Sequence, residues 1–236
     1  EPDGYFRSDN LVSNETTFQH VIPTLVGTIG AGAAYLGVGP DQNFTYMVAL
    51  RPRIAFIVDI RRGALLQHLL YKALFEEAED RAAFLSLLFG RARPAGLAAD
   101  APPEVLIDAY AAAPRDSALH ARARELVRAR LVERHGFVLS EDDLRGIAYV
   151  QDAFHDAGPE LTYAYPNGYG TFGPRRMPTY GELMAEHDGQ GIQRSYLASE
   201  ANYGVLRDLQ LRNLVVPVVG NFAGDRALRA VGAWLR

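Results

Sequence analysis

Two glycines and a distant aspartate have the types and the spacing to bind a ribose-containing ligand. Gly37 and Gly39 end an apolar segment, and Asp59 ends the next apolar segment, 22 positions after Gly37. Glycines let backbone amides approach a ligand at the start of a helix, because they carry no Cβ. A carboxylate at the end of the neighbouring parallel strand can accept hydrogen bonds from both ribose hydroxyls. The sequence therefore predicts a nucleotide-type site where two strands end.

The elements that must position these residues are a strand ending near Gly37, a short helix, and a second strand over residues 53–59. Strands that alternate with helices in this way are typical of a parallel α/β sheet. The third glycine of the dinucleotide fingerprint is missing, because Pro40, Asp41 and Gln42 follow Gly39. The pattern alone is a weak signal for any one ligand.

The motifs LGVGPDQNF, IVDIRR and LLYKAL, within residues 36–74, resemble the first two motifs of class I S-adenosylmethionine-dependent methyltransferases. The segments SDNLVSNETTFQHV, YLGVGPDQNFTY, FIVDIRR, LLYKALF and NLVVPVVGNFAG resemble, over nearly the whole chain, a bacterial family of uncharacterised methyltransferase-like proteins. The resemblance implies a Rossmann-like, mostly parallel sheet with flanking helices. It also implies S-adenosylmethionine as the cofactor, bound by Gly37, Gly39, Asp41, Asn43 and Asp59. Tyr35 stands where the methyltransferase motif usually has an acidic residue.

Three functions remain open on this pattern. Methyl transfer requires mainly that the acceptor be aligned behind the sulfonium, so it needs no conspicuous acid–base motif. A non-catalytic Rossmann-like protein that binds a ligand or a partner is the second interpretation, and the two departures from the methyltransferase pattern and the missing last strand favour it. An NAD-dependent oxidoreductase is the third interpretation, although the sequence has no Tyr-x-x-x-Lys arrangement beside a strand.

Composition indicates one globular domain over residues 1–236, with 48% hydrophobic residues. The net charge of −4 argues against a nucleic-acid-binding surface, for which clustered Lys and Arg are typical. There are no cysteines, which excludes disulfides and thiolate metal sites but leaves the choice between a cytoplasmic and an exported protein open. Residues 21–40 carry no charge, yet their glycines and prolines favour a loop and a buried strand over a membrane span. We expect a small-molecule ligand, no metal, and an oligomeric state that the sequence leaves open.

The N-terminal arm, residues 1–12, leads to a predicted helix. Ser13 or Asn14 can cap this helix, and Glu15 in its first turn suits the positive end of the helix dipole. Pro23 is expected to bend or break the helix. The arm and Glu15 either fold over the pocket to bind substrate or serve only as a cap.

Apolar periodicity predicts further helices at about 63–74, 80–89, 104–113, 117–134 and 141–155, the last with a capping box of Ser140 and Asp143. We expect a helical and loop insertion over about residues 91–195. His68 and Lys72 lie four residues apart, which suits a metal or acid–base role in principle but favours a surface pair or a histidine at the edge of the core.

Residues 158–178 combine aromatic side chains with glycines and prolines, which is typical of a lid or binding loop. Tyr169 is a candidate to stack on a substrate, and Arg175 is a candidate to bind an anionic group on it. Alternatively, the rings only pack the loop against the domain. Ser195 or Ser199 could form a hydrolase triad with His187 and Asp188, but the sequence lacks the Gly-x-Ser-x-Gly turn that exposes a nucleophilic serine. Ser199 is expected to cap a helix instead.

The run at residues 213–224 fits a buried parallel strand, provided that Pro217 need not donate to a neighbour. Asn221 and Phe222 follow it and loosely resemble the acceptor site after the fourth strand of methyltransferases. They are the candidate catalytic residues, Asn221 by hydrogen bonding and Phe222 by packing. A last helix is expected over 225–235, with no strand after it, so that the sheet is either truncated or one edge strand short.

Overall fold

The computed structural model describes residues 10–30, 32–163, 176–224 and 226–235. Within these ranges the chain is an α/β protein with a three-stranded parallel sheet: β1 (Ala34–Gly37), β2 (Ile54–Asp59) and β3 (Val215–Val219), in the order β1-β2-β3. Gly37 pairs with Ile57, and Asp59 pairs with Val219. The prediction of a parallel α/β sheet with flanking helices is confirmed, and this arrangement is consistent with a Rossmann-like fold.

The central strand explains why the sheet forms here. Every residue of β2 is buried, as expected for an apolar run covered on both faces. Pro217 lies within β3 opposite Ile57. In the described part of the chain β3 pairs only with β2, so the missing N–H of Pro217 can face away from the sheet. The predicted third strand is therefore confirmed.

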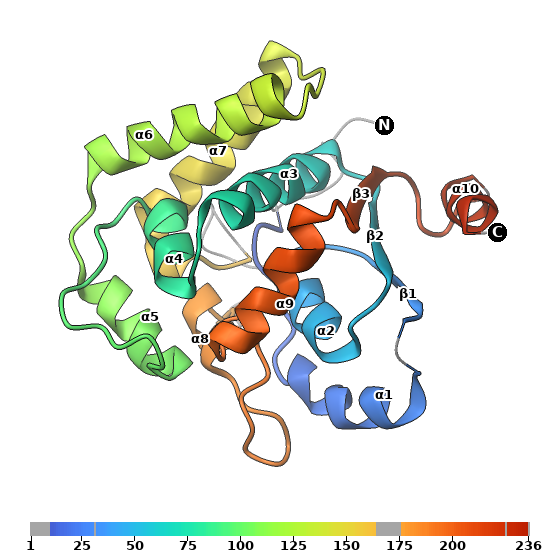
Figure 1. The fold of residues 1–236 in the computed structure, drawn as a ribbon, viewed down its shortest axis with the longest axis horizontal. Coiled ribbons are helices and arrows are strands. Elements are labelled where there is room, and N and C mark those ends of the chain that lie inside the picture. Colours follow the sequence, from blue (N-terminus) through green and yellow to red (C-terminus); the bar gives the residue numbers. More distant parts are fainter. Residues whose placement is uncertain (1–9, 31, 164–175, 225, 236) are drawn as a thin grey trace.

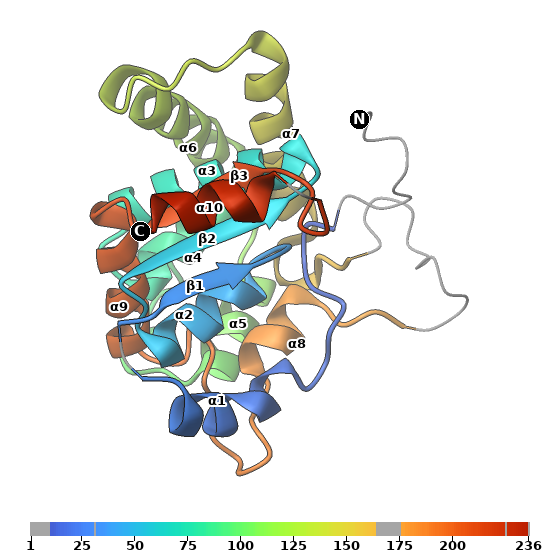
Figure 2. The ribbon, with the colours of Figure 1, turned by 90° about the vertical axis from the view of Figure 1, so that its right-hand side faces the viewer.

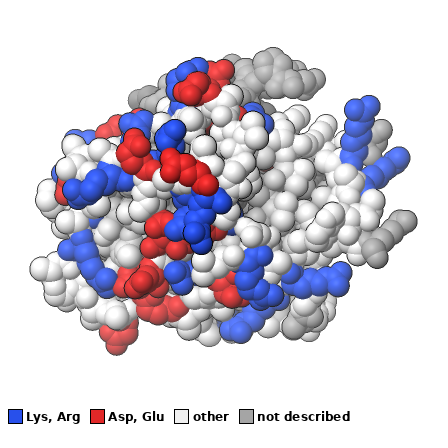
Figure 3. Space-filling view, turned by 45° about the horizontal axis from the view of Figure 1, so that its top comes forward, with Lys and Arg blue, Asp and Glu red and all other residues white. Residues whose placement is uncertain are grey.

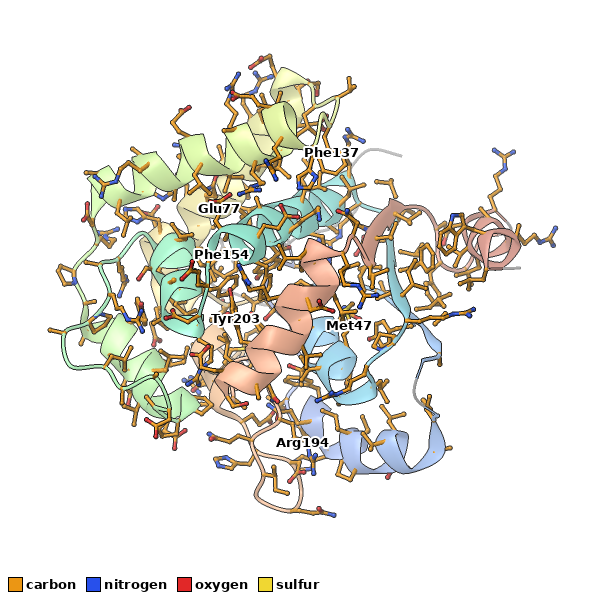
Figure 4. All side chains as sticks on the ribbon, viewed as in Figure 1. Met47, Glu77, Phe137, Phe154, Arg194 and Tyr203 are labelled. Atoms are coloured by element: carbon orange, nitrogen blue, oxygen red, sulfur yellow. The ribbon has the colours of Figure 1, made fainter. Side chains whose placement is uncertain are left out.

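Helices cover the two faces of the sheet unequally. Figure 2 shows α10 (Ala227–Trp234) in front of the sheet, most of the other helices behind it, and α1 (Ile22–Thr28) below it. The rear layer includes α2 (Gln42–Leu50), α3 (Arg62–Glu77) and α9 (Glu200–Leu211). Its core is rich in aromatic rings, whereas the α10 face has a small cluster around Phe56 and Val231. In Figure 4, Met47, Phe154 and Tyr203 are labelled on three elements of the rear layer, and all three are buried.

All the remaining helices between β2 and β3 lie on the rear side, on the left in Figure 1. They are α4 (Arg81–Phe89), α5 (Pro103–Ala112), α6 (Ser117–Arg128), α7 (Glu141–Ala157) and α8 (Tyr180–Ala185). A π-helical turn (Ala129–Arg134) continues α6, and a short 3₁₀ helix (Gly158–Glu160) follows α7. The predicted helices are confirmed within a few residues at their ends.

Local capping was predicted correctly for α7. Ser140 Oγ accepts from the Asp143 backbone N–H at 3.1 Å, and the Asp143 carboxylate accepts from the Ser140 N–H at 3.0 Å. These reciprocal bonds satisfy two groups that an uncapped helix start would leave unpaired. The same carboxylate binds Arg62 of α3, with Nη2 to Oδ2 at 2.7 Å. The cap of α7 is thereby attached to the first turn of α3.

The predicted N-terminal helix begins later than expected. Ser13 Oγ accepts from the Glu15 N–H within a turn, and the first helical residues form a 3₁₀ helix (Phe18–Val21) followed by α1 (Ile22–Thr28). The prediction of a cap at Ser13 or Asn14 was wrong, because Thr17 adopts a left-handed conformation that breaks the helix path. Pro23 lies in the first turn of α1, where its missing N–H costs nothing.

Candidate functional site

The carboxyl ends of all three strands meet at one edge of the sheet. β1 ends at Gly37, β2 ends at Asp59, and β3 ends at Val219. The Gly220 N–H donates to the Asp59 carbonyl at 2.8 Å, so the segment after β3 continues alongside the end of β2. We call this region the carboxyl edge. Ligands of open α/β sheets bind in this position.

The loop between β1 and α2 is held by Asn43. The Asn43 side-chain amide donates to the carbonyls of Val38 at 2.9 Å and Pro40 at 2.7 Å, and its Oδ1 accepts from the Tyr35 hydroxyl at 2.7 Å. A Cβ on Gly37 would lie 2.0 Å from Asn43 Oδ1. Gly37 therefore has a packing reason to be glycine. Tyr35, which replaces the acidic residue of the methyltransferase motif, takes part in the same network.

His68 lies beneath this loop. Its Nε2 is 2.9 Å from the Gly39 carbonyl, which can only accept, so Nε2 carries the proton and Nδ1 is a bare acceptor. Burial lowers the pKa of His68, and the charges of Asp59 and Arg61 act on it in opposite directions. Of the two interpretations favoured for His68, the surface pair with Lys72 was wrong, because both side chains are buried and Lys72 Nζ pairs with Glu76 at 2.7 Å. His68 instead packs within the core, nearer to the alternative of a histidine at the core edge.

The Asp59 carboxylate is bound by Arg61, two residues later in the chain. Arg61 Nε donates to Asp59 Oδ1 at 3.2 Å, and Arg61 Nη2 donates to Oδ2 at 3.1 Å. The Arg61 backbone N–H also donates to Oδ1, at 2.9 Å. Both side chains are largely buried, at 8% and 9% exposure. Asp59 has the position expected of a ribose-binding carboxylate, but Arg61 already binds both of its oxygens.

Asn221 and Phe222 lie at the carboxyl edge, but not where the methyltransferase resemblance had suggested. In the Rossmann strand order the fourth strand neighbours the first, whereas β3 pairs with β2 on the side opposite β1. The strand pairing therefore does not match a site after a fourth strand, and the catalytic role of Asn221 and Phe222 stays a prediction. Asn221 Oδ1 accepts from the Ala223 N–H at 2.9 Å, and Phe222 is 39% exposed.

Exposed apolar side chains gather at the ends of the strands. Each strand end contributes at least one side chain that is at least 38% exposed: Val38 after β1, Ile60 after β2, and Val219 and Phe222 at and after β3. Of these four, Val219 also lines a pocket of about 630 Å³ between β3 and α10, together with Phe56, Gly220, Asn221 and Trp234 among others. This volume lies within the range typical of small-molecule sites. The edge therefore combines a carboxylate with apolar surface.

The candidate substrate residues are only partly described. Glu15 is exposed and lines a second pocket, of about 520 Å³, with Tyr46 and Arg176. Tyr169 and Arg175 lie outside the described residues. The Ser195, His187 and Asp188 set has no catalytic geometry, because Ser195 is fully buried and Asp188 pairs with Arg194. Ser199 caps α9 by accepting from the Asn202 N–H at 3.1 Å, as predicted.

Asp41, which the methyltransferase resemblance assigned to the cofactor, is buried in this structure. It precedes α2 but makes no side-chain cap, and the residue is only 1% exposed. Burial raises the pKa of Asp41 to about 7, and the neighbouring Tyr196 acts in the opposite direction. The sequence did not predict this burial.

On the face drawn in Figure 3, basic and acidic side chains are interspersed on the left, beside a broad uncharged area with a few basic side chains at its right-hand edge. No group of three or more His, Cys, Asp or Glu side chains suited to a metal occurs among the described residues. Across the described ranges, no helix has both the length and the apolar character needed to cross a membrane.

Comparison with known proteins identifies the chain only at the level of its family. No match was found among curated proteins. The family model described as "Domain of unknown function (DUF7790)" matches residues 10–236, which is nearly the whole chain. The chain therefore belongs to the DUF7790 family.

Proposed function

We propose that the chain binds an adenosyl cofactor, S-adenosylmethionine, at the carboxyl edge and transfers its methyl group to an acceptor. The observation that carries this proposal is the meeting of the Gly37 loop, Asp59 and exposed apolar side chains at one edge of a parallel sheet. These are the three kinds of group that an adenosyl ligand needs: close backbone approach, a ribose carboxylate and a surface for the adenine ring.

The ribose, the adenine ring and the carboxylate of such a ligand would each meet a different part of the edge. Asp59 accepts three hydrogen bonds from Arg61, and a carboxylate has about four lone-pair positions, which leaves room for one ribose hydroxyl. Val219 pairs with Asp59 across the sheet, and its exposed side chain, with that of Phe222 three residues later, offers an apolar surface to adenine. α2 begins at Gln42, directly after the loop, but the Phe44 N–H donates to the Asp41 carbonyl at 2.9 Å and the Asn43 N–H donates to the Pro40 carbonyl at 3.4 Å, so the first turn of α2 offers a ligand little beyond the Gln42 N–H.

The reaction class follows from the cofactor. When bound, S-adenosylmethionine supplies a methyl group on a sulfonium; the bond from sulfur to carbon breaks as the acceptor's lone pair forms a new bond to carbon. S-adenosylhomocysteine leaves, and the acceptor's proton goes to solvent or to a nearby base. The chain's own contribution is to hold the two reactants in line and to exclude water. Asn221 and Phe222 remain candidates at this edge, now beside Asp59.

A second function is favoured by one specific observation. Asn43 fills the inner side of the glycine loop and Arg61 holds Asp59, so the chain satisfies its own candidate ligand groups. This arrangement suits a non-catalytic Rossmann-like scaffold that binds a different ligand or a partner. It predicts a folded chain that does not bind the adenosyl ligands.

Calorimetric titration distinguishes these functions. Purified chain is titrated with S-adenosylmethionine, S-adenosylhomocysteine and NAD, and the titrations are repeated on Asp59→Asn and on Asp108→Asn, an exposed control. We expect saturable binding of the adenosyl ligands that Asp59→Asn weakens at least tenfold and Asp108→Asn leaves unchanged. Binding of NAD alone indicates the oxidoreductase, and no binding to a folded chain indicates the scaffold.

A further inference from the structure

The front face of the sheet, on which α10 packs, has a small core. In the described part of the chain this core consists of Ile54, Phe56, Val58 and Val231, whereas the rear core contains most of the buried aromatic rings. Figure 2 shows α10, a helix of eight residues, in front of this face. A groove of about 630 Å³ lies between α10 and β3.

The α10 side of the groove is one stripe of the helix surface. Arg226, Ala230 and Trp234 all line the groove and lie four residues apart, so their side chains follow one another along the helix. The Ala230 N–H donates to the Arg226 carbonyl at 2.9 Å, which places Arg226 one turn before Ala230. Ala230 has only a methyl group between two large side chains. The stripe is therefore hollow at its centre, with a guanidinium at one end and an indole at the other.

The sheet side of the groove is apolar, and contacts hold both ends of α10 against it. Phe56 and Val218 line the groove from neighbouring strands, and the Phe56 ring lies 5.5 Å from the Trp234 ring, edge to face. At the other end of the helix, a Cβ on Gly220 would lie 2.6 Å from the Ala227 Cβ, so the end of β3 touches the start of α10. The groove is therefore a feature of how the chain packs.

The polar groups of the groove are donors. Arg226 is the one charged residue among the described lining residues, and it has no ion pair with another described residue. Arg212, an exposed arginine shortly before β3, instead binds Asp208 at 3.1 Å. Asn221 Oδ1 accepts from the Ala223 N–H at 2.9 Å, which leaves the Asn221 amide N–H groups available to a ligand. Positive charge with a neighbouring N–H donor matches an anion.

We propose that this groove binds an alkyl carboxylate of medium length, such as octanoate. Its carboxylate binds Arg226, whose planar guanidinium can donate to both oxygens, and Asn221. Its alkyl chain follows the helix past Ala230 toward Trp234, a distance of about 12 Å at the helical rise per residue. An alkyl chain suits the groove better than a ring, because the Phe56 and Trp234 rings already contact each other. Contact with the chain removes apolar surface of both partners from water.

This site does not depend on the proposed methyl transfer. Its contacts come from β3, α10 and the segment between them, whereas the adenosyl ligand requires Asp59 and the Gly37 loop. The two regions border each other at Val219 and Asn221. Each is titrated without the ligand of the other, so either proposal can fail while the other stands.

Fluorescence of Trp234 tests the site, because Trp234 is the only tryptophan of the chain and lines the groove. Its side chain is exposed, so a bound alkyl chain should shift its emission to shorter wavelength. The full chain is titrated with octanoate below its micellar concentration, and separately with acetate and octylamine. We expect a saturable shift with octanoate. We expect none with acetate, which lacks the chain, or with octylamine, which has the opposite charge.

Two pairs of variants tie binding to the groove. Arg226→Gln and Arg229→Gln remove the same charge from the start of α10, but only Arg226 lines the groove. Arg226→Gln should weaken octanoate binding about tenfold, through loss of a charged hydrogen bond, and Arg229→Gln less than about twofold. Ala230→Leu fills the hollow and should abolish binding, whereas Ala233→Leu, exposed and outside the groove, should retain it. Leucine suits a helix at both positions, so this pair keeps the test decisive if an arginine variant does not fold.

Four results would overturn the proposal. They are no saturable shift with octanoate in a folded chain, equal binding of octylamine, equal effects of the two arginine variants, and undiminished binding to Ala230→Leu. A shift produced by vesicles of anionic phospholipid but not by octanoate would also overturn it, and would indicate a membrane-binding surface instead.

Discussion

Arg61 binds both carboxylate oxygens of Asp59 from two residues away in the chain. The pair lies at the end of the central strand, and both side chains are largely buried. In a Rossmann-like protein the corresponding carboxylate is free to accept from a ribose. A ligand that bound Asp59 would have to share the carboxylate with Arg61 or displace Arg61.

Removal of either partner should destabilise the fold. Arg61→Gln leaves a buried carboxylate without its charged partner, and we expect a loss of about 3 kcal/mol in the free energy of unfolding. Asp59→Asn should cost a similar amount, and the double variant should cost less than the sum by about 1–3 kcal/mol. Urea denaturation of the four proteins measures this coupling. Additive costs would show that the pair contributes no interaction energy.

Gly37→Ala should destabilise the chain although the substitution is small. The new methyl group would lie 2.0 Å from Asn43 Oδ1, so the loop network must shift, at a cost of about 1–3 kcal/mol. Gly63→Ala is the matched control, because a Cβ there meets nothing within 4 Å and lies in helix α3. It should be neutral or stabilise by up to about 1 kcal/mol. Similar melting temperatures for the two variants would refute the role given to Asn43.

Asp41→Asn should stabilise the chain at alkaline pH in sodium salts. The pKa of Asp41 rises from 3.8 to about 7 on folding, so the folded state binds this proton more tightly than the unfolded state. Stability therefore falls as pH rises from about 4 to about 7, by about 4 kcal/mol in total, and the asparagine variant avoids this loss. Unfolding measured at pH values below 4 and above 7 checks the difference.

Comparison with the variant separates this titration from that of its neighbours. Burial raises the pKa of Tyr71, Tyr180 and Tyr196 well above the ordinary value, so these three stay uncharged near neutral pH. Burial lowers the pKa of His68, so its contribution to stability rises as pH rises toward its ordinary pKa, with the opposite sign to Asp41; it is present in both proteins and cancels in their difference. A variant whose advantage over the wild type is the same at acid and alkaline pH would contradict the raised pKa of Asp41.

Asp143 should contribute to acid unfolding with the opposite sign. The Arg62 guanidinium holds the pKa of Asp143 well below its ordinary value of 3.8. The pair therefore stabilises the fold above about pH 4, and this contribution disappears as pH falls toward the lowered pKa. Asp143→Asn should be less stable than the wild type at neutral pH and approach it in strong acid. An unchanged gap across this range would contradict the ion pair.

Local features of the fold were predictable because their causes are local. Ser140 and Asp143 form a capping box that depends on residues three apart, and β2 is a short apolar run between turn residues. The glycine loop and Asp59 were likewise found from spacing. The late start of the first helix was missed because Thr17 adopts a left-handed conformation. β-branched residues rarely adopt this conformation, so the sequence did not indicate it.

Long-range features of the site were not predictable from one sequence. The position of β3 beside β2 depends on strand pairing across most of the chain, so Asn221 and Phe222 could not be assigned to the right strand position. The inward orientation of Asp41 depends on rings such as Tyr196, which is 155 positions away in the sequence. The pairing of Arg61 with Asp59 is local in the sequence. It was missed because the motif specifies only the position of the carboxylate and not the residues that bind it.

Amide chemical shifts in the presence of S-adenosylhomocysteine test the central claim most directly. The isotope-labelled chain is titrated and its backbone resonances are followed by NMR. An adenosyl site at the carboxyl edge predicts saturable shifts in residues 37–42, 59–61 and 219–222, which come from all three strand ends. Saturable shifts confined to another surface, or none at all in a folded chain, would contradict it.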